Sequence, residues 1–232
     1  MKTFITGVLA SAASALNASE YEFMQYLTQH GKMYTTMEEF QMRKDLFQAK
    51  DQVISAHNSR PANFTLGHNK FSDWSIDEFR SLLGEKGTPP NANCPDPQPL
   101  DLNASLPDYV NWVEAGMTTP VKDQASCGSC WTFATTGTVE SANAIFGSGL
   151  KSLSEQQLVD CVTVDDGCQG GWTYDAYEYL MSHNAYLEED YPYTASDGTC
   201  SYEKAKASDV TLSTYVCIHP QTPPAMKIAV AQ

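Results

Sequence analysis

The chain has 232 residues, 28 acidic and 14 basic, and its formal net charge is −14 at pH 7. This acidic balance argues against a nucleic-acid-binding protein and against electrostatic binding to anionic lipid, because both need a basic surface. No uncharged apolar run reaches about 18 residues, so no membrane-spanning helix is expected. The length allows one or two domains, and a hydrophobic content of 42% argues against disorder throughout.

Residues 1–15 are typical of a secretory signal peptide, the alternative being a frayed N-terminal helix. A short apolar stretch follows Lys2, and the small residues Ala13, Ser14 and Ala15 predict cleavage after Ala15. Seven cysteines favour an oxidising compartment. Glycosylation sequons begin at Asn17, Asn63 and Asn103, in agreement with a secretory route.

The next part of the chain has helical periodicity. Helices are expected over residues 20–31, 36–58 and 75–83, with a short strand over 63–66. Residues 84–105 have the composition of an exposed, proline-rich linker. Further helices are expected near 130–146, 154–161 and 172–183. The plan is a small helical unit, a tether and a disulfide-bearing second unit.

The most informative stretch contains Cys127 and Cys130 in a Cys-x-x-Cys arrangement. A zinc site would need a second close pair of Cys or His, and a redox pair would follow a buried strand, whereas here a loop precedes it. The third interpretation is one structural and one reactive cysteine. Cys130 would begin a helix, where unpaired N–H groups and the dipole favour the thiolate. Gln124, on the loop before it, could aim an N–H at a developing oxyanion.

These residues give the chain its resemblance to the papain family of cysteine proteases, to cathepsin L-like enzymes especially. The resemblance covers the start of the mature enzyme at Leu106, the glutamine loop, the nucleophile motif and three later motifs. In order, the later motifs are Leu153–Cys161, Gly167–Gly171 and Tyr191-Pro-Tyr193.

The resemblance implies a role for each matching residue. Cys130 would be the nucleophile, Gln124 the oxyanion donor, and Gly170 and Gly171 the backbone wall that pairs with an extended peptide. Trp172 would lie near the pocket for the second side chain before the cleaved bond. By the same resemblance Cys127 is expected to bridge Cys168, and Cys161 to bridge Cys200.

The N-terminal unit resembles the ERFNIN-type inhibitory propeptide of the same family. Five residues lie on one face of one helix: Glu39, Arg43, Phe47, Ile54 and Asn58. Lys50 departs from that pattern, where Asn is usual. The companion GxNxFxD motif is complete: Gly67, Asn69, Phe71 and Asp73.

The family's plan implies an α+β fold, mostly α in this chain. It would comprise a signal peptide (1–15), an inhibitory helical propeptide (16–105) and an incomplete papain-like peptidase domain (106–232), with the helical left lobe present and the β-rich right lobe largely missing. The propeptide would run backwards through the cleft. Release at low pH is a hypothesis: carboxylates such as Asp73 and Glu39, if paired in the closed form, would lose that stabilisation as pH falls.

A papain-like site also needs a histidine, oriented by an Asn, to protonate the leaving amine. The family supplies both from the right lobe. His30, His57 and His68 belong to the propeptide-like part, whereas His183 and His219 fit a helix end and a loop. We therefore expect this chain as written to have negligible proteolytic activity.

The leading hypothesis is thus a cysteine endopeptidase zymogen acting on peptide or protein substrates, without metal or cofactor, in the lysosome or outside the cell. The alternatives are a propeptide-type inhibitor of other papain-like proteases and a redox protein using Cys127 and Cys130. Cys94 and Cys217 have no assigned role.

Overall fold

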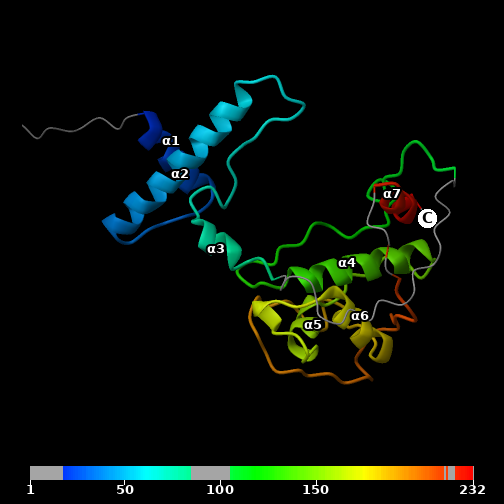
Figure 1. Cartoon of the computed structure of the whole chain (residues 1–232). Helices are drawn as coiled ribbons and strands as arrows, with labels where there is room; N and C mark the ends of the chain where they lie inside the picture. The colour runs from blue at the N-terminus through cyan, green and yellow to red at the C-terminus, as the bar shows by residue number, and fades with distance from the viewer. Residues whose placement is uncertain (1–17, 85–104, 217, 219–222, 232) are drawn as a thin grey trace, which may run out of the picture. The chain divides into compact units, whose positions relative to one another are not determined.

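The computed structural model describes residues 18–84, 105–216, 218 and 223–231, and its chain divides into two compact units, Met1–Phe79 and Arg80–Gln232 (Figure 1). The expected signal peptide, most of the linker, Asn17, Asn103, Cys94, Cys217 and His219 lie outside the described residues. None of the described helices is long and apolar enough to cross a membrane.

The first unit is built on α1 (Ala18–Gln29) and α2 (Met37–Asn58), followed by α3 (Ile76–Arg80). Thr36 caps α2 because its hydroxyl accepts a hydrogen bond from the N–H of Glu39 at 3.2 Å. The two long helices pack through a mostly aromatic hydrophobic cluster of Phe23, Tyr26, Leu27 and Phe47, with Tyr34 and Phe40 packed against it. The first two helix predictions are therefore confirmed.

Two predictions for this unit are wrong in detail. Residues 63–66 form no strand, because the alternating residues have no neighbouring strand to pair with. Instead, the side-chain amide of Asn58 bonds both the N–H and the carbonyl of Leu66, each at 2.8 Å. The helix expected over 75–83 ends at Arg80, and two turn hydrogen bonds carry the chain on to Gly84.

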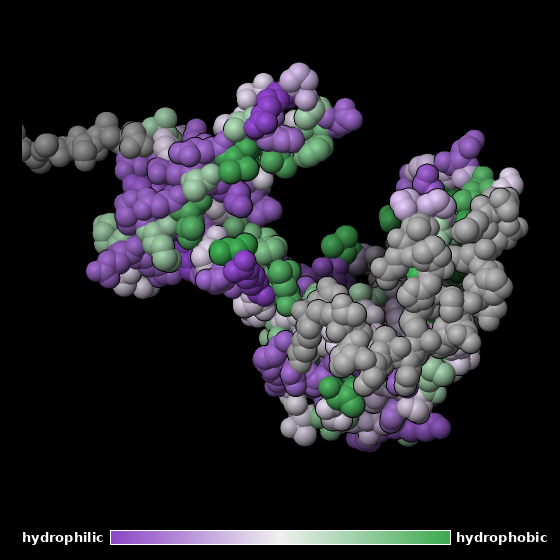
Figure 2. Space-filling view, viewed as in Figure 1, coloured by the Kyte–Doolittle hydropathy of each residue, from purple (hydrophilic) through white to green (hydrophobic). Residues whose placement is uncertain are grey.

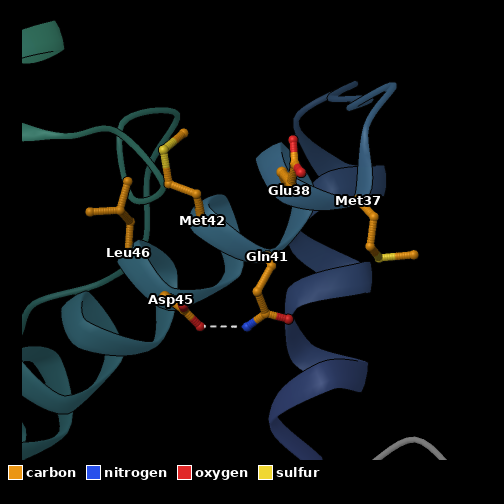
Figure 3. A pocket seen from close by; sticks show the side chains of 6 residues that line it. All are labelled: Met37, Glu38, Gln41, Met42, Asp45 and Leu46. Atoms are coloured by element: carbon orange, nitrogen blue, oxygen red, sulfur yellow. Dashed lines mark hydrogen bonds between the residues drawn. The ribbon is translucent and has the colours of Figure 1, made fainter.

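The outer face of α2 carries an open groove lined by Met37, Glu38, Gln41, Met42, Asp45 and Leu46 (Figure 3). Gln41 Nε2 donates to Asp45 Oδ1 at 2.7 Å across one helical turn. The visible surface of this unit is mostly hydrophilic with separate apolar patches (Figure 2). The groove contains none of the predicted site residues.

The second unit is organised around α4 (Cys130–Ile145), which contacts both α5 (Glu155–Cys161) and α6 (Thr173–Ser182) (Figure 1). A 3₁₀ turn, η1 (Gly167–Gln169), and a helix near the end of the chain, α7 (Pro223–Ala231), complete it. The buried core comprises Trp131, Val139, Leu153, Leu158, Val162, Ala176, Leu180, Ala185 and Val210. The described residues contain no β-strand, only an isolated bridge between Leu153 and Leu187, so the mostly helical fold is confirmed.

A buried ion cluster joins this unit's loops to its helices. Lys122 Nζ lies 2.7 Å from Glu140 Oε1 and 2.7 Å from Glu155 Oε1, and both carboxylates are fully buried. Burial alone would lower the pKa of Lys122, but the hydrogen bonds and charges of Glu140 and Glu155 raise it overall. Thr119, Thr136 and the N–H of Leu153 bond the same carboxylates. The network fixes the loop that leads to Gln124.

Candidate active site

Cys130 is the first residue of α4, and its thiol is free and partly exposed. The preceding turn is held by the Cys127–Cys168 disulfide and by the N–H of Gly128, which donates to the carbonyl of Cys168 at 2.8 Å. A second disulfide joins Cys161 to Cys200. The turn therefore holds a free thiol at a helix N-terminus, where the helix dipole favours negative charge.

The side-chain amide of Gln124 points at backbone carbonyls next to this thiol. Its Nε2 donates to the carbonyl of Cys127 at 2.8 Å and to that of Leu82 at 3.0 Å. Ala125 has a positive φ of 52°, and Asp123 Oδ1 accepts its N–H at 2.9 Å, so the loop turns sharply after Gln124. The amide thus donates to carbonyl oxygens of residue 82 and of the turn that precedes Cys130.

Gly170 and Gly171 form a backbone edge that also bonds residues 82–84. The N–H of Gly171 donates to the carbonyl of Gly84 at 2.9 Å. A Cβ on Gly171 would lie 2.7 Å from Trp131 Cε2, and Gly170 has a positive φ of 117°, so both positions require glycine. Leu82 and Gly84 are buried while Ser81 and Leu83 are exposed. Residues 82–84 therefore lie along the candidate site with two carbonyls bonded to its donors.

Trp172 follows directly and caps α6 without a side-chain hydrogen bond. Its N–H donates to Asp165 Oδ2 at 3.2 Å, and its ring stacks on Tyr174 with centroids 5.8 Å apart. The structure thus places Trp172 immediately next to the glycine edge.

Tyr193 belongs to the site, although the sequence marked it only as part of a motif. Its hydroxyl lies 2.9 Å from the carbonyl oxygen of Gln124 and 2.5 Å from Ser129 Oγ. Its N–H donates to Glu188 Oε1 at 2.9 Å. No local pattern could have revealed this role, because the partners are more than 60 residues away in sequence.

Histidines contact other parts of the chain. The ring of His183 stacks on Tyr179 with centroids 4.2 Å apart and lies edge-on to Tyr202 at 4.9 Å. His30, His57 and His68 contact residues of the first unit. Among the described residues, no hydrogen bond joins a histidine to Cys130, and no group of three or more His, Cys, Asp or Glu residues could hold a metal ion.

The propeptide-like motif forms one connected network in the first unit. Arg43 donates to both oxygens of Glu78, at 2.6 and 2.7 Å, while Glu39 lies farther away at 3.5 Å. Asp73 is fully buried and accepts hydrogen bonds from Tyr26, Lys32 and Tyr34. The hydrogen bond from Arg43 is the main cause that lowers the pKa of Glu78 to about 2.

The remaining motif residues support the same loop. Phe47 stacks on the ring of His68 with centroids 4.1 Å apart, and Asn69 Oδ1 accepts the N–H of Phe71 at 2.9 Å. Gly67 and Lys50 line a hollow together with Phe71. Ile54 is partly buried on α2.

Residues 106–232, more than half of the chain, match the papain family of cysteine proteases, and residues 23–79 match the cathepsin propeptide inhibitor domain. The chain belongs to the papain family. It is 41% identical to pro-cathepsin H of Bos taurus over 212 residues, which are 88% of this chain and 62% of that relative. It is 40% identical to cysteine proteinase 15A of Pisum sativum over 202 residues, which are 82% and 55% of the two chains.

Solved proenzymes have the same fold as this papain-family chain. Digestive procathepsin L 3 of Tenebrio molitor superposes with a TM-score of 0.82 at 29% identity, over 94% of this chain and 71% of that one. The recombinant stem bromelain precursor superposes with a TM-score of 0.81 at 30% identity, over 93% and 70%. The chain therefore spans less than two thirds of the length of the curated relatives named above, and about 70% of these solved proenzymes.

Proposed function

We propose that the chain is the zymogen form of a cysteine endopeptidase, with a signal peptide (1–15), a propeptide (16–105) and a peptidase unit (106–232). Support comes from the family membership, the propeptide inhibitor match and the free thiol of Cys130 at the start of α4. One observation carries the proposal: the donors Gln124 Nε2 and Gly171 N–H both bond carbonyls of residues 82–84.

In the proposed reaction, the Cys130 thiolate attacks the carbonyl carbon of a substrate peptide bond. The carbonyl oxygen becomes an oxyanion, which Gln124 Nε2 stabilises by donating to it. The C–N bond then breaks as the leaving amine takes up a proton from a general acid, and the acyl group stays on Cys130 as a thioester. Water hydrolyses this thioester, which releases the carboxylic acid and restores the thiol. The N–H of Gly171 and the carbonyl-binding edge around it would hold the substrate backbone in extended form. Trp172 would border the pocket for the side chain two positions before the cleaved bond.

In the zymogen, residues 82–84 would occupy the positions that the substrate takes. Gln124 Nε2 donates to the carbonyl of Leu82 rather than to an oxyanion, and the carbonyl of Gly84 accepts the N–H of Gly171. We therefore propose that the chain's own propeptide is its first binding partner, and that peptide or protein substrates bind only after it leaves.

A peptide-shaped electrophile tests this assignment. A peptidyl vinyl sulfone with a hydrophobic side chain at the second position should modify Cys130 at least tenfold faster than a vinyl sulfone without a peptide. The modified residue is identified by peptide mass spectrometry after the pH is lowered to release the propeptide. Gln124→Leu should reduce this preference. Equal rates for the two reagents would show that no peptide-binding cleft surrounds Cys130.

We further propose that these 232 residues by themselves hydrolyse peptide bonds at a negligible rate. The leaving amine needs a proton donor, and the contacts of His183 hold its ring against Tyr179 and Tyr202. The test is to express the chain and its Cys130→Ser variant and to compare cleavage of a peptide with a hydrophobic second residue. Efficient cleavage that Cys130→Ser abolishes would contradict this proposal.

The proposed route is the secretory pathway, with the lysosome or the extracellular space as destination. The two disulfides support an oxidising compartment. Asn63 begins a sequon on an exposed loop. Expression in a eukaryotic secretory system should give a chain glycosylated at Asn63. Peptide N-glycosidase should remove the glycan and convert the asparagine at position 63 to aspartate, which mass spectrometry detects. A secreted chain whose Asn63 peptide is entirely unmodified would remove that support.

A second candidate function is inhibition of other papain-like proteases. It is favoured by the first unit, which has its own aromatic core and matches the propeptide inhibitor domain over residues 23–79. Residues 16–105 should then inhibit a mature cathepsin at nanomolar concentration. Inhibition only above micromolar concentration would exclude this function.

A further inference from the structure

Ser129 stands at the N-cap of α4 but does not cap it. Serine at this position normally accepts a hydrogen bond from an N–H of the first turn, which stabilises the helix. Here Ser129 is fully buried, and its side chain makes no capping hydrogen bond. Its hydroxyl lies instead 2.5 Å from the hydroxyl of Tyr193.

The direction of this hydrogen bond follows from the second partner of Tyr193. A phenol has one proton, and Tyr193 donates it to the carbonyl oxygen of Gln124 at 2.9 Å, because a carbonyl can only accept. Ser129 must therefore donate to the Tyr193 oxygen. The single hydroxyl of Tyr193 thus joins the loop of Gln124 to the helix end of Cys130.

Tyr193 itself is held from two sides. Its ring packs edge-on against Phe133 of α4 with centroids 5.0 Å apart. Its N–H donates to Glu188 Oε1 at 2.9 Å. Burial raises the pKa of Tyr193, and this keeps the phenol protonated and able to donate.

We propose that Tyr193 is a positioning residue for the nucleophile: it holds the Ser129 hydroxyl away from the first-turn N–H groups of α4. The N–H of Thr132 donates to the carbonyl of Ser129 at 2.9 Å, so the N–H of Trp131 is the one that this arrangement leaves to the negative charge of the Cys130 thiolate, at the helix end where the dipole favours it. If the bond to Tyr193 were absent, the Ser129 hydroxyl would turn to cap its own helix. The inference rests on the proposed function of Cys130 as nucleophile.

The test measures the reactivity of Cys130 in the whole 232-residue chain. The rate constant for iodoacetamide modification is determined at pH 6, and the Cys130 peptide is quantified by mass spectrometry. Y193F keeps the ring and removes the hydroxyl. We expect the rate to fall about two- to fivefold, the range of a single helix-terminus interaction. Y215F removes a hydroxyl elsewhere in the same unit and should leave the rate unchanged.

The decisive comparison uses Ser129→Ala as a second background. If Tyr193 acts by holding the serine hydroxyl, Y193F should have no effect when that hydroxyl is missing, so Y193F/S129A should react at the rate of S129A. If Y193F lowers the modification rate equally in the wild-type and Ser129→Ala backgrounds, Tyr193 acts through general packing, and the proposal is overturned. No loss in either background would overturn it as well.

Hydrogen exchange gives a second readout. In Y193F the amides at the start of α4 should exchange more slowly than in the wild type, because Ser129 now caps them, and Y193F/S129A should not show this protection. If Y193F does not fold, Y193M lacks the hydroxyl too and fills similar space beside Phe133. Iodoacetamide needs no peptide-binding cleft, so this result is independent of the peptidyl-reagent test of the proposed function.

Discussion

The backbone N–H of Gly171 donates to the carbonyl oxygen of Gly84 at 2.9 Å, so a glycine next to the linker meets the glycine edge of the candidate site. The two backbones approach closely because neither residue has a side chain. A Cβ on Gly84 would lie 1.8 Å from the carbonyl oxygen of Gly128 and 3.3 Å from the Cα of Gly170. The contact therefore depends on glycine at position 84.

Gly84→Ala should displace residues 82–84 from the site. Since Gly84 is surrounded by backbone atoms that cannot move aside, the added methyl group must break the bonds to Gly171 and Gln124. We expect iodoacetamide to modify Cys130 several-fold faster at pH 7 in the variant, measured on the Cys130 peptide. Gly137→Ala adds a methyl group in α4 with no atom within 4 Å and serves as the control. An unchanged rate in Gly84→Ala would show that residues 82–84 do not cover the thiol.

Much of the candidate site could be predicted from the sequence because its signals are local. The Gly-Ser turn before an apolar helical run predicted α4 with Cys130 at its first position, and Gln124 lies in the adjacent loop. The roles of Leu82, Gly84 and Tyr193 could not be predicted, because their partners are distant in sequence. The composition near residue 84 indicated only a linker, since a short segment bonded to distant residues has no periodicity of its own.

The wrong strand at 63–66 has a similar explanation. Alternating apolar residues indicate a strand only where another strand can pair with it. The side-chain amide of Asn58 bonds the N–H and the carbonyl of Leu66 in place of a neighbouring strand. The alternating pattern of residues 63–66 gives no sign of these two hydrogen bonds.

Glu78 should make the stability of the first unit depend on pH. Its folded-state pKa of about 2 lies below its ordinary value of 4.5, mainly because Arg43 bonds both its oxygens. The stabilisation is therefore present above about pH 4.5 and is lost as the pH falls towards 2. Hydrogen exchange of α2 peptides in the whole chain should show E78Q less protected than the wild type at pH 6 and equal to it near pH 2. E38Q, on an exposed residue of α2, controls for the lost charge.

Glu188 should make the stability of the second unit depend on pH in the opposite direction. Burial raises its pKa above the ordinary value of 4.5, despite the N–H of Tyr193, and its Oε2 is buried without a hydrogen-bond partner. The folded state then binds more protons than the unfolded state, so this residue lowers stability as the pH rises above about 4.5. In thermal unfolding, the midpoint temperature of E188Q should rise relative to that of the wild type as the pH increases from 4.5 to 7. E189Q removes the neighbouring exposed charge as a control. A difference that does not change with pH would contradict the prediction.

Lys122→Met should strongly destabilise the second unit. Lys122 is the cation between Glu140 and Glu155, whose side chains are 0% and 1% exposed, so its loss leaves two buried carboxylates without their charge partner. Breaking a buried ion pair from one side typically costs about 3–5 kcal/mol. Because Lys122 is 22% exposed, we expect the lower end, about 3 kcal/mol in the free energy of unfolding by urea.

The matched control for this substitution is Lys206→Met. Lys206 pairs with Glu203 at 2.7 Å, but both side chains are more than half exposed, and such surface pairs contribute little to stability. The unfolding free energy of Lys206→Met should therefore stay close to that of the wild type. The triple variant K122M/E140Q/E155Q should recover part of the loss in K122M, because neutral amides cost less to bury than charged carboxylates. A K122M chain as stable as K206M would mean that water reaches Glu140 and Glu155 once the lysine is removed.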